Sequence, residues 1–367
     1  MRTAASGSRC LKKIQRRFLP SCGMRFEMRM RMKIEGFKKP AGFLAFALLA
    51  ALMFSLLNSV LCVKSVSGID QARGLYAQPE GSVDVLFLGS SHVHCNVDSR
   101  VLWEEEGIAA YLCTTAEQPL WNSYHYLVEA LKTQEPKLVV LDVFSPAHSQ
   151  EDFQEKWLAE NLEGMRFSWN KYEMIRASAR SEHLSWLFGY PRYHDRYARL
   201  SEKDFQNFFW NREEKARWKG FVELHTHARM TEMDMSRVTG RTPLTPKSQE
   251  YLDRIIALTQ KEGIPLMLLN APYLVEEKDQ HIYNEIAAQA GEQGLLFLNT
   301  NYPSIYREMG LDFQTDFADH AHLNAQGAVK YTGYLGKWMK EHYQLPDRRG
   351  QKGYESWEEQ RAAYMEE

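Results

Sequence analysis

Short apolar runs alternate with longer amphipathic segments over most of the chain that follows residue 82. The short runs are rich in Val, Leu and Phe, a composition typical of parallel strands that are buried on both faces. We expect strands at residues 83–88, 108–113, 137–142, 265–270 and 295–298. Helices with one apolar face are expected at residues 100–106, 121–134, 246–262, 277–293 and 324–342. Because strands and helices alternate, the sequence predicts an α/β fold with a sheet of five parallel strands.

The alternating pattern is interrupted between residues 145 and 241. This stretch is rich in Trp, Arg, Tyr and Glu and contains few strand-like runs. It predicts a mainly helical insertion that packs above the carboxyl edge of the sheet and builds a lid or a substrate cleft there. Two flanking segments lack the pattern, and we expect residues 64–82 to form an exposed linker and residues 346–367 a charged, loosely attached tail. The predicted domain therefore covers residues 83–345.

The amino-terminal part of the chain combines a basic leader with a long apolar run. Residues 1–40 carry many Lys and Arg side chains but only two acidic ones. Residues 41–63 are uncharged after the leader and long enough to cross a hydrocarbon core of about 30 Å. A cleavable signal peptide would have a shorter apolar core and a small-x-small cleavage site, and Leu61 before Cys62 makes a poor lipoprotein signal. The sequence predicts one transmembrane signal anchor at 41–63.

The charge of the leader predicts the orientation of this anchor. Basic residues that flank a span remain in the cytoplasm, so the domain that follows residue 64 is expected outside it, attached to the cell membrane by a single pass. The leader could instead be a nucleic-acid-binding arm, but its position next to a span favours the topological role. The chain of 367 residues has a formal net charge of -2, which argues against nucleic acid as a main partner.

Cysteine and histidine usage bears on disulfides and metal sites. Only Cys95 and Cys113 lie in the predicted domain, where they either pair or remain partly buried thiols. We favour thiols, because a domain of this size needs no disulfide for stability. Two pairs of histidines at i, i+2 are candidate metal ligands: His92 with His94, and His225 with His227. No Cys or Glu framework accompanies them, so we expect no metal and no cofactor.

The first predicted strand ends in the sequence Gly89-Ser90-Ser91-His92. Gly and Ser are common in ordinary turns, so this segment alone could be a turn without a catalytic role. In open α/β sheets, however, ligands bind outside the carboxyl ends of the strands. Gly89 allows the backbone to bend, and Ser91 is then placed to begin a helix with its hydroxyl in the open. Backbone N–H groups there can stabilise an oxyanion, and we expect His92 to support this candidate nucleophile from beside it.

A second polar segment, Asp319-His320-Ala321-His322, precedes the last predicted helix. His322 is the candidate base, since an imidazole accepts and returns protons near neutral pH. Asp319, three residues earlier, can reach Nδ1 of His322 and hold its tautomer. His320 has no such partner, because the residue three before it is Phe317. Asn324 is expected to cap the following helix. Together with Ser91, this segment predicts a Ser-His-Asp triad.

The two segments, Gly89 to His92 after a buried strand and Asp319-x-x-His322 before the last helix, resemble those of the SGNH/GDSL hydrolase superfamily. More narrowly, the chain resembles the membrane-anchored SGNH-like proteins of Gram-positive bacteria, which are related to cell-envelope O-acyltransferases and esterases. The resemblance covers about residues 83–343, most of the predicted domain. It implies a flavodoxin-like fold with three layers, α/β/α, and a catalytic triad of Ser91, Asp319 and His322.

The resemblance also bears on oxyanion stabilisation and substrate binding. It implies such roles for residues beside the nucleophile, in the family's second block and in a segment of the narrower group: Gly89, His92, Thr114, Thr115, Gln118 and His194. The chain departs from the family at two places. No glycine stands among residues 113–115, where the second block has one, and the third-block Gly-x-Asn-Asp has no counterpart after Leu141.

These observations lead to two expectations of function. The first is an extracytoplasmic serine esterase or O-acyltransferase that acts on acyl esters, for which the resemblance implies cell-envelope polysaccharides; water or a sugar hydroxyl would resolve the acyl-enzyme. The second is a non-catalytic SGNH-like binding module that partners a membrane-bound O-acyltransferase. The missing third block favours the binding module, whereas the intact Ser, Asp and His favour the enzyme.

Overall fold

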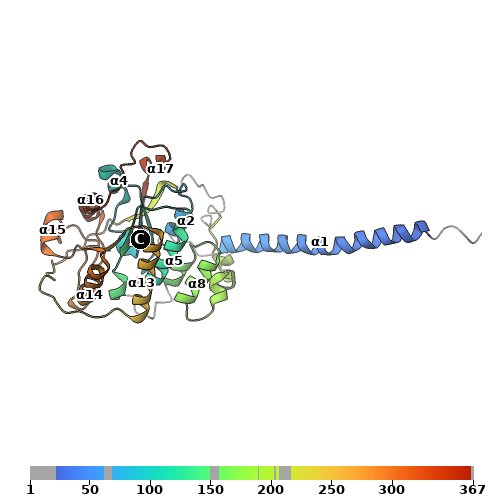
Figure 1. Ribbon diagram of the computed structural model, residues 1–367, viewed down its shortest axis with the longest axis horizontal. Coiled ribbons are helices and arrows are strands. Elements are labelled where there is room, and N and C mark those ends of the chain that lie inside the picture. Colours follow the sequence, from blue (N-terminus) through green and yellow to red (C-terminus); the bar gives the residue numbers. More distant parts are fainter. Residues whose placement is uncertain are drawn as a thin grey trace, which may run out of the picture. The chain divides into compact units, whose positions relative to one another are not determined.

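A computed structural model describes residues 22–61, 68–148, 157–188, 190–201, 204–205 and 216–364. The chain divides into two units, residues 1–59 and 60–367. The described part of the smaller unit is helical and belongs to α1 (Cys22–Leu61), drawn in blue in Figure 1, whose last two residues fall in the larger unit. Within the described ranges, one helical stretch, the 22 residues Pro40–Leu61, is long and apolar enough to cross a membrane. It agrees with the span predicted from the sequence, whose last two residues lie outside the described part.

The larger unit is built on a sheet of five strands. They are β1 (Val85–Gly89), β2 (Ala110–Thr114), β3 (Leu138–Asp142), β5 (Leu266–Asn270) and β6 (Leu296–Asn299). The strands lie in the order β2-β1-β3-β5-β6, and every neighbouring pair is parallel. The predicted sheet of five parallel strands is confirmed, with boundaries displaced by one or two residues.

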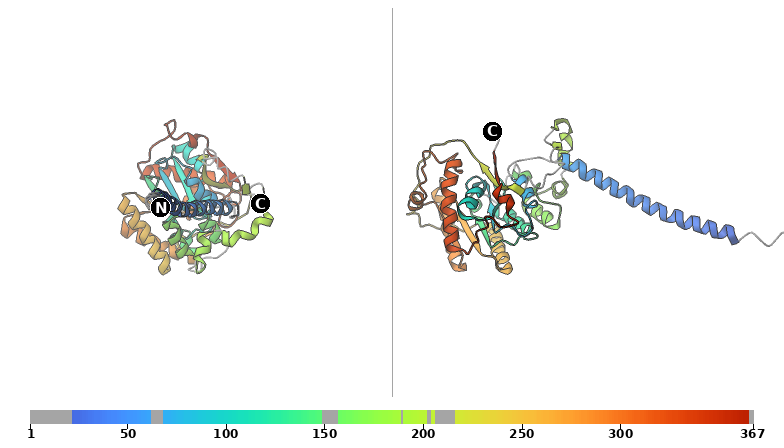
Figure 2. Two further views of the ribbon diagram at one scale, coloured as in Figure 1. Left: turned by 90° about the vertical axis from the view of Figure 1, so that its right-hand side faces the viewer. Right: turned by 90° about the horizontal axis from the view of Figure 1, so that it is seen from above.

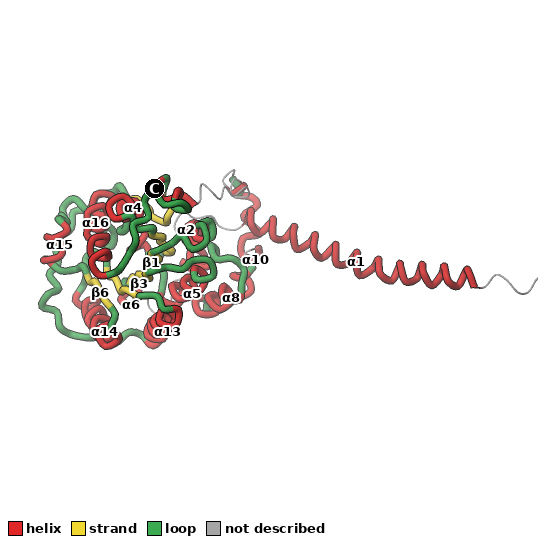
Figure 3. Tube along the Cα trace, turned by 45° about the horizontal axis from the view of Figure 1, so that its top comes forward, coloured by secondary structure: helices red, strands yellow, loops and turns green. Residues whose placement is uncertain are grey.

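Helices pack against both faces of this sheet. Alternate side chains of a strand point to opposite faces, so Leu86 and Leu88 belong to one buried cluster and Val85 and Phe87 to another. The first cluster includes α5 (Leu120–Ala130), α13 (Pro246–Glu262) and α14 (Glu277–Gln293). The second includes α4 (Ser99–Glu106), α15 (Pro303–Met309) and α16 (Ala325–His342). Figure 3 shows the yellow strands between these two groups.

The ends of these helices follow local chemistry. Asp98 caps α4 by accepting a hydrogen bond of 2.9 Å from the Arg100 backbone N–H. Asn324 caps α16 in the same way, at 3.1 Å from the N–H of Gly327, as the sequence predicts. Gly327 permits close packing, because a Cβ atom there would lie 2.2 Å from the carbonyl oxygen of Asp316. The last helix therefore starts immediately after the loop that holds His322.

The segment before β1 is not an exposed linker, and this expectation is wrong for residues 68–82. Helix α2 (Ile69–Leu75) begins there, and Ile69 and Leu75 are buried in the core. The side chain of Gln134 accepts from the backbone N–H groups of Ser82 and Val83, each at 3.1 Å. The apolar residues of this short helix have too little periodicity to reveal it in the sequence. Residues 64–67 of the predicted linker lie outside the described residues.

The expectation of a loosely attached tail is also wrong for residues 346–364. Trp357, in helix α17 (Glu355–Glu358), is fully buried, and its indole N–H donates to the Ala110 carbonyl at 3.3 Å. Arg348 pairs with Asp84 at 2.7 Å. Strand β7 (Arg361–Tyr364) pairs in parallel with β4 (Trp218–Glu223), as the right-hand view of Figure 2 shows. The high charge of this segment obscures the few aromatic residues that anchor it.

The insertion is mainly helical where it is described. Its helical elements are α6 (Ser145–His148), α7 (Leu158–Leu162), α8 (Trp169–Ser178), α9 (His183–Leu187), α10 (Tyr190–Tyr193) and the 3-10 helix η2 (His194–Arg199). The predicted position above the carboxyl edge holds only in part. Helix α8 packs on the outside of α5. Asn161 reaches the loop after β2, and Ala228 pairs with Phe317 beside the His322 loop.

Replacement of Trp357 by alanine is expected to lower the free energy of unfolding of the larger unit by about 3–5 kcal/mol, because it empties a fully buried aromatic site. The control is Val329→Ala, at a side chain that is 45% exposed and lies outside the insertion, and its expected effect is within about 0.5 kcal/mol. Denaturant-induced unfolding in detergent, followed by near-UV circular dichroism, measures both. Equal effects of the two replacements would contradict the packed position of the carboxyl-terminal segment.

Candidate active site

Ser91 stands at the first position of a short helix that follows β1. Helix α3 (Ser91–His94) is capped by Ser90, whose hydroxyl accepts from the His92 N–H at 3.2 Å. The turn between strand and helix needs Gly89, because a Cβ atom there would lie 2.5 Å from Asp142 Cβ and 2.9 Å from Val93. The strand, the glycine and the cap together place Ser91 at the carboxyl edge of the sheet, as the sequence predicts.

The side chains of Ser91, His322 and Asp319 meet at this edge, although 231 residues separate the first two. His322 Nε2 lies 2.9 Å from Ser91 Oγ, and its Nδ1 lies 2.9 Å from Asp319 Oδ2 and 3.0 Å from Oδ1. The imidazole of His322 is 22% exposed and the Asp319 side chain 48% exposed, so solvent reaches the group. When Nδ1–H donates to the carboxylate, Nε2 can accept the Ser91 proton. The predicted contacts are all present.

Asp319 is an ionised partner for this imidazole. Partial burial raises the pKa of Asp319, but hydrogen bonds from His322 and from the backbone N–H groups of Ala321 and His322 outweigh that effect and bring the pKa to about 2. Those backbone bonds measure 2.8 Å and 3.0 Å. The carboxylate is therefore negative at neutral pH and holds the His322 ring in one orientation.

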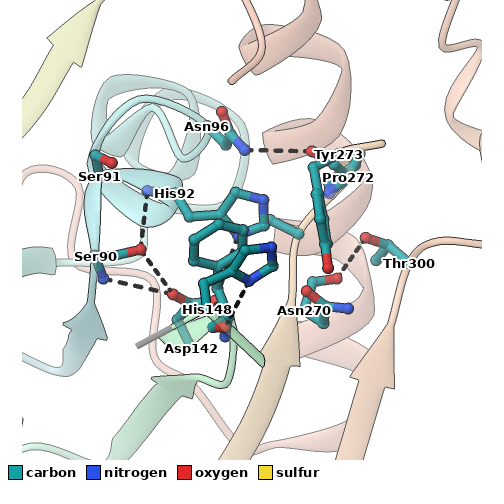
Figure 4. A network of polar contacts seen from close by, with 12 residues as sticks. Ser90, Ser91, His92, Asn96, Asp142, His148, Asn270, Pro272, Tyr273 and Thr300 are labelled. Atoms are coloured by element: carbon teal, nitrogen blue, oxygen red, sulfur yellow. Dashed lines mark hydrogen bonds and ion pairs between the residues drawn. The ribbon is translucent and has the colours of Figure 1, made fainter. Parts of the chain in front are cut away.

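The loop that carries His322 is attached to the nucleophile side through Asn96. Asn96 Oδ1 accepts from the Leu323 N–H at 2.8 Å, and its amide donates to the Pro272 carbonyl at 3.4 Å, as Figure 4 shows for the second contact. Phe317 pairs with Leu323 across the same loop and with Ala228 of the insertion. Sequence reasoning missed Asn96, because nothing in its local pattern distinguishes it from an ordinary turn residue.

Asp142, at the end of β3, stabilises the turn between β1 and α3 by hydrogen bonds. Its Oδ2 accepts from the Ser90 hydroxyl at 3.3 Å and from the Ser90 N–H at 3.4 Å, and its Oδ1 accepts from the Phe144 N–H at 3.2 Å. Figure 4 shows these groups beneath Ser91. Ser90 is only 1% exposed and its hydroxyl is engaged, so the geometry favours Ser91 over Ser90 as nucleophile. Asp142 could have been recognised in the sequence as a carboxylate at the end of a buried strand, but the sequence analysis did not assign it a role.

His92 fills the space behind the nucleophile. Its ring stacks on Phe144 with centroids 4.4 Å apart and meets the edge of Tyr273 at 5.0 Å, while its Nδ1 lies 3.5 Å from Asp142 Oδ1. The ring is fully buried, and this burial lowers the pKa of His92. The structure thus places His92 beside the nucleophile as a neutral, packed ring. His148 continues the stack on the other side of Phe144, at 3.9 Å.

The other residues assigned to oxyanion or substrate binding bond mainly within the fold. Thr114 Oγ1 contacts His94 Nδ1 at 3.0 Å, and the Thr115 hydroxyl donates to Asn161 at 2.6 Å. Gln118 is buried, and its amide donates to Ser123 at 3.0 Å. His194 is the first residue of η2, where its ring lies 6.4 Å from that of Tyr190. The described contacts bring none of these four side chains to Ser91.

His94 makes the fold sensitive to acid. Complete burial lowers the pKa of His94 to about 3, from an ordinary value of 6.5. Because the unfolded chain then binds a proton more readily than the folded one, the stability contribution is complete above pH 6.5 and decreases as the pH falls toward 3. We expect a loss of about 2–3 kcal/mol from this residue at pH 4.5.

The expected loss is measured by denaturant unfolding at pH 7.5 and pH 4.5. His94→Gln should reduce the difference between the two pH values, since the amide does not titrate in this range. The control His225→Gln changes an exposed histidine and should leave the difference unchanged. A wild-type stability that is equal at both pH values would show that His94 does not titrate as its burial requires.

The thiols and the histidine pairs do not form a further site. Cys95 and Cys113 are free and buried, which confirms the expectation of unpaired thiols, and burial raises the pKa of both. Within the part of the chain that the structure describes, no three His, Cys, Asp or Glu side chains form a group that could hold a metal ion.

The arrangement is suited to nucleophilic catalysis. A hydroxyl lies within hydrogen-bonding distance of an imidazole, and a carboxylate orients the other ring nitrogen. Comparison of the chain with protein-family models and with curated proteins found no match in either case. The function is therefore inferred from the geometry of Ser91, His322 and Asp319 and from the resemblance of the two sequence segments that carry them.

Proposed function

We propose that this protein is a serine esterase or O-acyltransferase of the SGNH/GDSL type that acts on acyl esters of cell-envelope polysaccharides. The observation that carries the proposal is the hydrogen-bonded series of Ser91, His322 and Asp319, with 2.9 Å at each of its two contacts. The near-complete burial of Ser90 supports the assignment of Ser91 as the reacting hydroxyl. An acylated carbohydrate is the substrate class that the resemblance of the chain favours.

In the proposed mechanism, Ser91 Oγ attacks the ester carbonyl while His322 Nε2 accepts its proton. The tetrahedral intermediate collapses when the imidazolium returns that proton to the leaving alcohol, and the acyl group remains on Ser91. Water or a sugar hydroxyl then loses a proton to His322 and attacks the acyl-enzyme. As the acyl–Oγ bond breaks, the imidazolium returns that proton to Ser91 Oγ, which regenerates the serine. Asp319 stabilises the imidazolium during both steps and stays ionised, consistent with its low pKa.

We propose in addition that the larger unit has a flavodoxin-like fold with three layers. The strand order β2-β1-β3-β5-β6 supports this assignment, since it is the order 2-1-3-4-5 when the five strands are numbered along the chain. The two apolar clusters, which lie on opposite faces of the sheet, support it as well. In such a fold, ligands bind at the carboxyl edge where the strand order reverses, which here is next to β1 and Ser91.

We propose that helix α1 anchors the protein and that the larger unit lies outside the cytoplasm. The length and apolar character of Pro40–Leu61 support a single span. The basic residues among 1–39 support the orientation, because such residues remain on the cytoplasmic side. An envelope polysaccharide and a site outside the cytoplasm are consistent with each other, since the ester substrate would be present on the same side.

A second candidate function is a binding module without catalysis, which would serve a membrane-bound O-acyltransferase. The position of Asp142 favours it. Asp142 ends the strand after which the family carries its third block, and its carboxylate is engaged by Ser90 and Phe144. A carboxylate accepts hydrogen bonds and cannot stabilise an oxyanion by donating one. If the remaining donors are insufficient, the triad would bind an ester without turning it over.

A membrane-impermeant fluorophosphonate tests both the chemistry and the orientation. Intact cells that express the full chain should be labelled, and Ser91→Ala should abolish the label. Ser90→Ala is the matched control: it removes a helix cap worth about 1 kcal/mol and should leave most of the label. Labelling only after lysis would contradict the orientation alone. Wild-type protein that stays unlabelled in lysed cells would contradict the hydrolase and leave the binding module.

A further inference from the structure

The exposed apolar side chains of the larger unit are concentrated in one part of the insertion. Ten large hydrophobic residues of this unit are exposed among the described residues, and seven of them lie between residues 167 and 205. These seven, which we call the aromatic face, are Phe167, Trp169, Leu184, Phe188, Tyr190, Tyr197 and Phe205. The most exposed of them are Trp169 at 75% and Tyr197 at 73%. A random scatter of surface residues would not produce this concentration.

The residues of the aromatic face come from elements that pack against one another. Its residues lie on or beside consecutive elements, since α8 packs against α9, α9 against α10, and α10 against η2. The rings of Phe167 and Phe188 lie 5.8 Å apart although they flank different helices. Arg196 of η2 pairs with Asp204 at 3.0 Å and so brings Phe205 to the same region. Figure 3 shows α8 and α10 together at one side of the larger unit.

Soluble proteins rarely leave so many large apolar side chains of one region exposed to water. Two arginines of the same region stack on neighbouring rings that lie outside the face itself. Arg192 stacks over the ring of Trp186 at 3.5 Å, and Arg166 over the ring of Tyr76 at 4.1 Å. Trp and Tyr accumulate at membrane–water interfaces, where a long cationic side chain can extend its charge toward the headgroups. The chemistry of the face therefore fits a lipid surface.

Few residues of sequence separate the candidate span from the larger unit. The candidate span ends at Leu61, and Gly68 of the larger unit follows after residues 62–67. The six residues between them can extend over roughly 20 Å at most. Gly68 lies beside Glu160, since a Cβ on Gly68 would be 3.0 Å from the Glu160 carbonyl oxygen. Gly164 lies against helix α2, because a Cβ atom on Gly164 would be 2.5 Å from the Cβ of Ala72. The start of the larger unit therefore lies next to the segment that leads to Phe167.

We propose that the aromatic face lies in the headgroup region of the membrane that holds α1, so that the larger unit is oriented on the bilayer by a second contact. The inference rests on the proposed anchor and is independent of the proposed chemistry. A tether that short raises the local concentration of lipid at the face, so a modest apolar contact is sufficient for binding. The partner is lipid, and the contact buries aromatic rings to the depth of the headgroups.

Fluorescence quenching in proteoliposomes tests the contact on the full chain. The background variant carries serine in place of Cys10, Cys22 and Cys62, while the buried Cys95 and Cys113 remain. A thiol-reactive environment-sensitive dye is then attached through Leu184→Cys, on the aromatic face. The matched control is Leu296→Cys, at an exposed leucine of the sheet's edge strand β6. The vesicles contain phosphatidylcholine that is brominated near the headgroup end of its acyl chains.

The dye at position 184 should lose at least about half of its fluorescence, whereas the dye at position 296 should lose less than about a tenth, given an insertion depth of about 5–10 Å. Adding Phe167→Ser and Trp169→Ser should reduce the quenching at position 184. Fluorophosphonate labelling of the same variants verifies that the fold and site persist. Equal quenching at positions 184 and 296 overturns the proposal. The proposal is also overturned if the dye at position 184 is not quenched in vesicles while the aromatic face cross-links to another protein in native membranes. If the wild-type protein does not react with the fluorophosphonate, that result contradicts the proposed chemistry and leaves the proposed lipid contact intact.

Discussion

Alanine in place of Ser91 or His322 is expected to reduce turnover of an acyl ester by about a thousand-fold or more. The reason is the 2.9 Å contact between Ser91 Oγ and His322 Nε2, through which the hydroxyl loses its proton as it attacks. Without the imidazole the serine is a weak nucleophile, and without the serine no acyl-enzyme forms. The two residues act as one unit, so the double variant should be little worse than either single one.

Initial rates on a p-nitrophenyl ester measure this effect, and thermal unfolding of each variant verifies the fold. Ser90→Ala serves as the control, because it changes the adjacent hydroxyl, which is buried against Asp142. If the losses from Ser91→Ala and His322→Ala multiply in the double variant, the two residues do not act as a unit. If Ser91→Ala retains wild-type turnover, the reaction does not proceed through this serine.

Asp319→Asn is expected to lower kcat by up to about ten-thousand-fold, with little effect on KM. Both carboxylate oxygens lie within 3.0 Å of His322 Nδ1, and the backbone N–H groups of Ala321 and His322 bind the same carboxylate. An amide in that place can donate to Nδ1, which leaves the proton on Nε2. In that tautomer the imidazole cannot accept the proton of Ser91.

A pH profile of kcat separates this effect from a loss of structure. Because the pKa of Asp319 is about 2, its carboxylate is ionised at pH 4 and above, so it should not contribute an acid limb there. The control Asp234→Asn changes an exposed aspartate that lies outside the site and should leave kcat unchanged. An acid limb above about pH 4 that is present in the wild type and absent from Asp319→Asn would contradict the low pKa of Asp319.

The sequence alone was sufficient to predict the sheet, most of the helices that pack on it, and the meeting of the two distant segments that carry Ser91 and His322. Buried parallel strands are short apolar runs whose neighbours along the chain are amphipathic helices, and both patterns are local. The same holds for Asp319 and His322, which share one loop, and for the cap of α16 by Asn324. The glycine at position 89 indicated the turn because backbone chemistry demands a residue without a side chain there.

Only the tertiary structure decided which polar residues support that turn. The spacing after Gly89 already favoured Ser91 over Ser90, but the structure supplies the partners of the two hydroxyls: Asp142, 52 residues from Ser90, binds the first, and His322 lies beside the second. Asn96 joins the nucleophile and base loops through a contact over 227 residues. Such contacts have no periodicity and no local signature, so no window of sequence contains them.

The ends of the predicted domain were decided in the same way. Ile69 and Trp357 are buried, yet each stands in a segment too short or too charged to show an amphipathic period. Burial of one large aromatic ring stabilises a segment by an amount that its surrounding charges do not offset, because those charges remain in water. Strand β7 needs β4 as a partner, and the pairing joins residues more than 140 positions apart. The sequence by itself determined the local elements and the residues of the candidate triad; the packing of the segments outside the sheet, and the support beneath Ser91, depend on long-range contacts that only the folded chain creates.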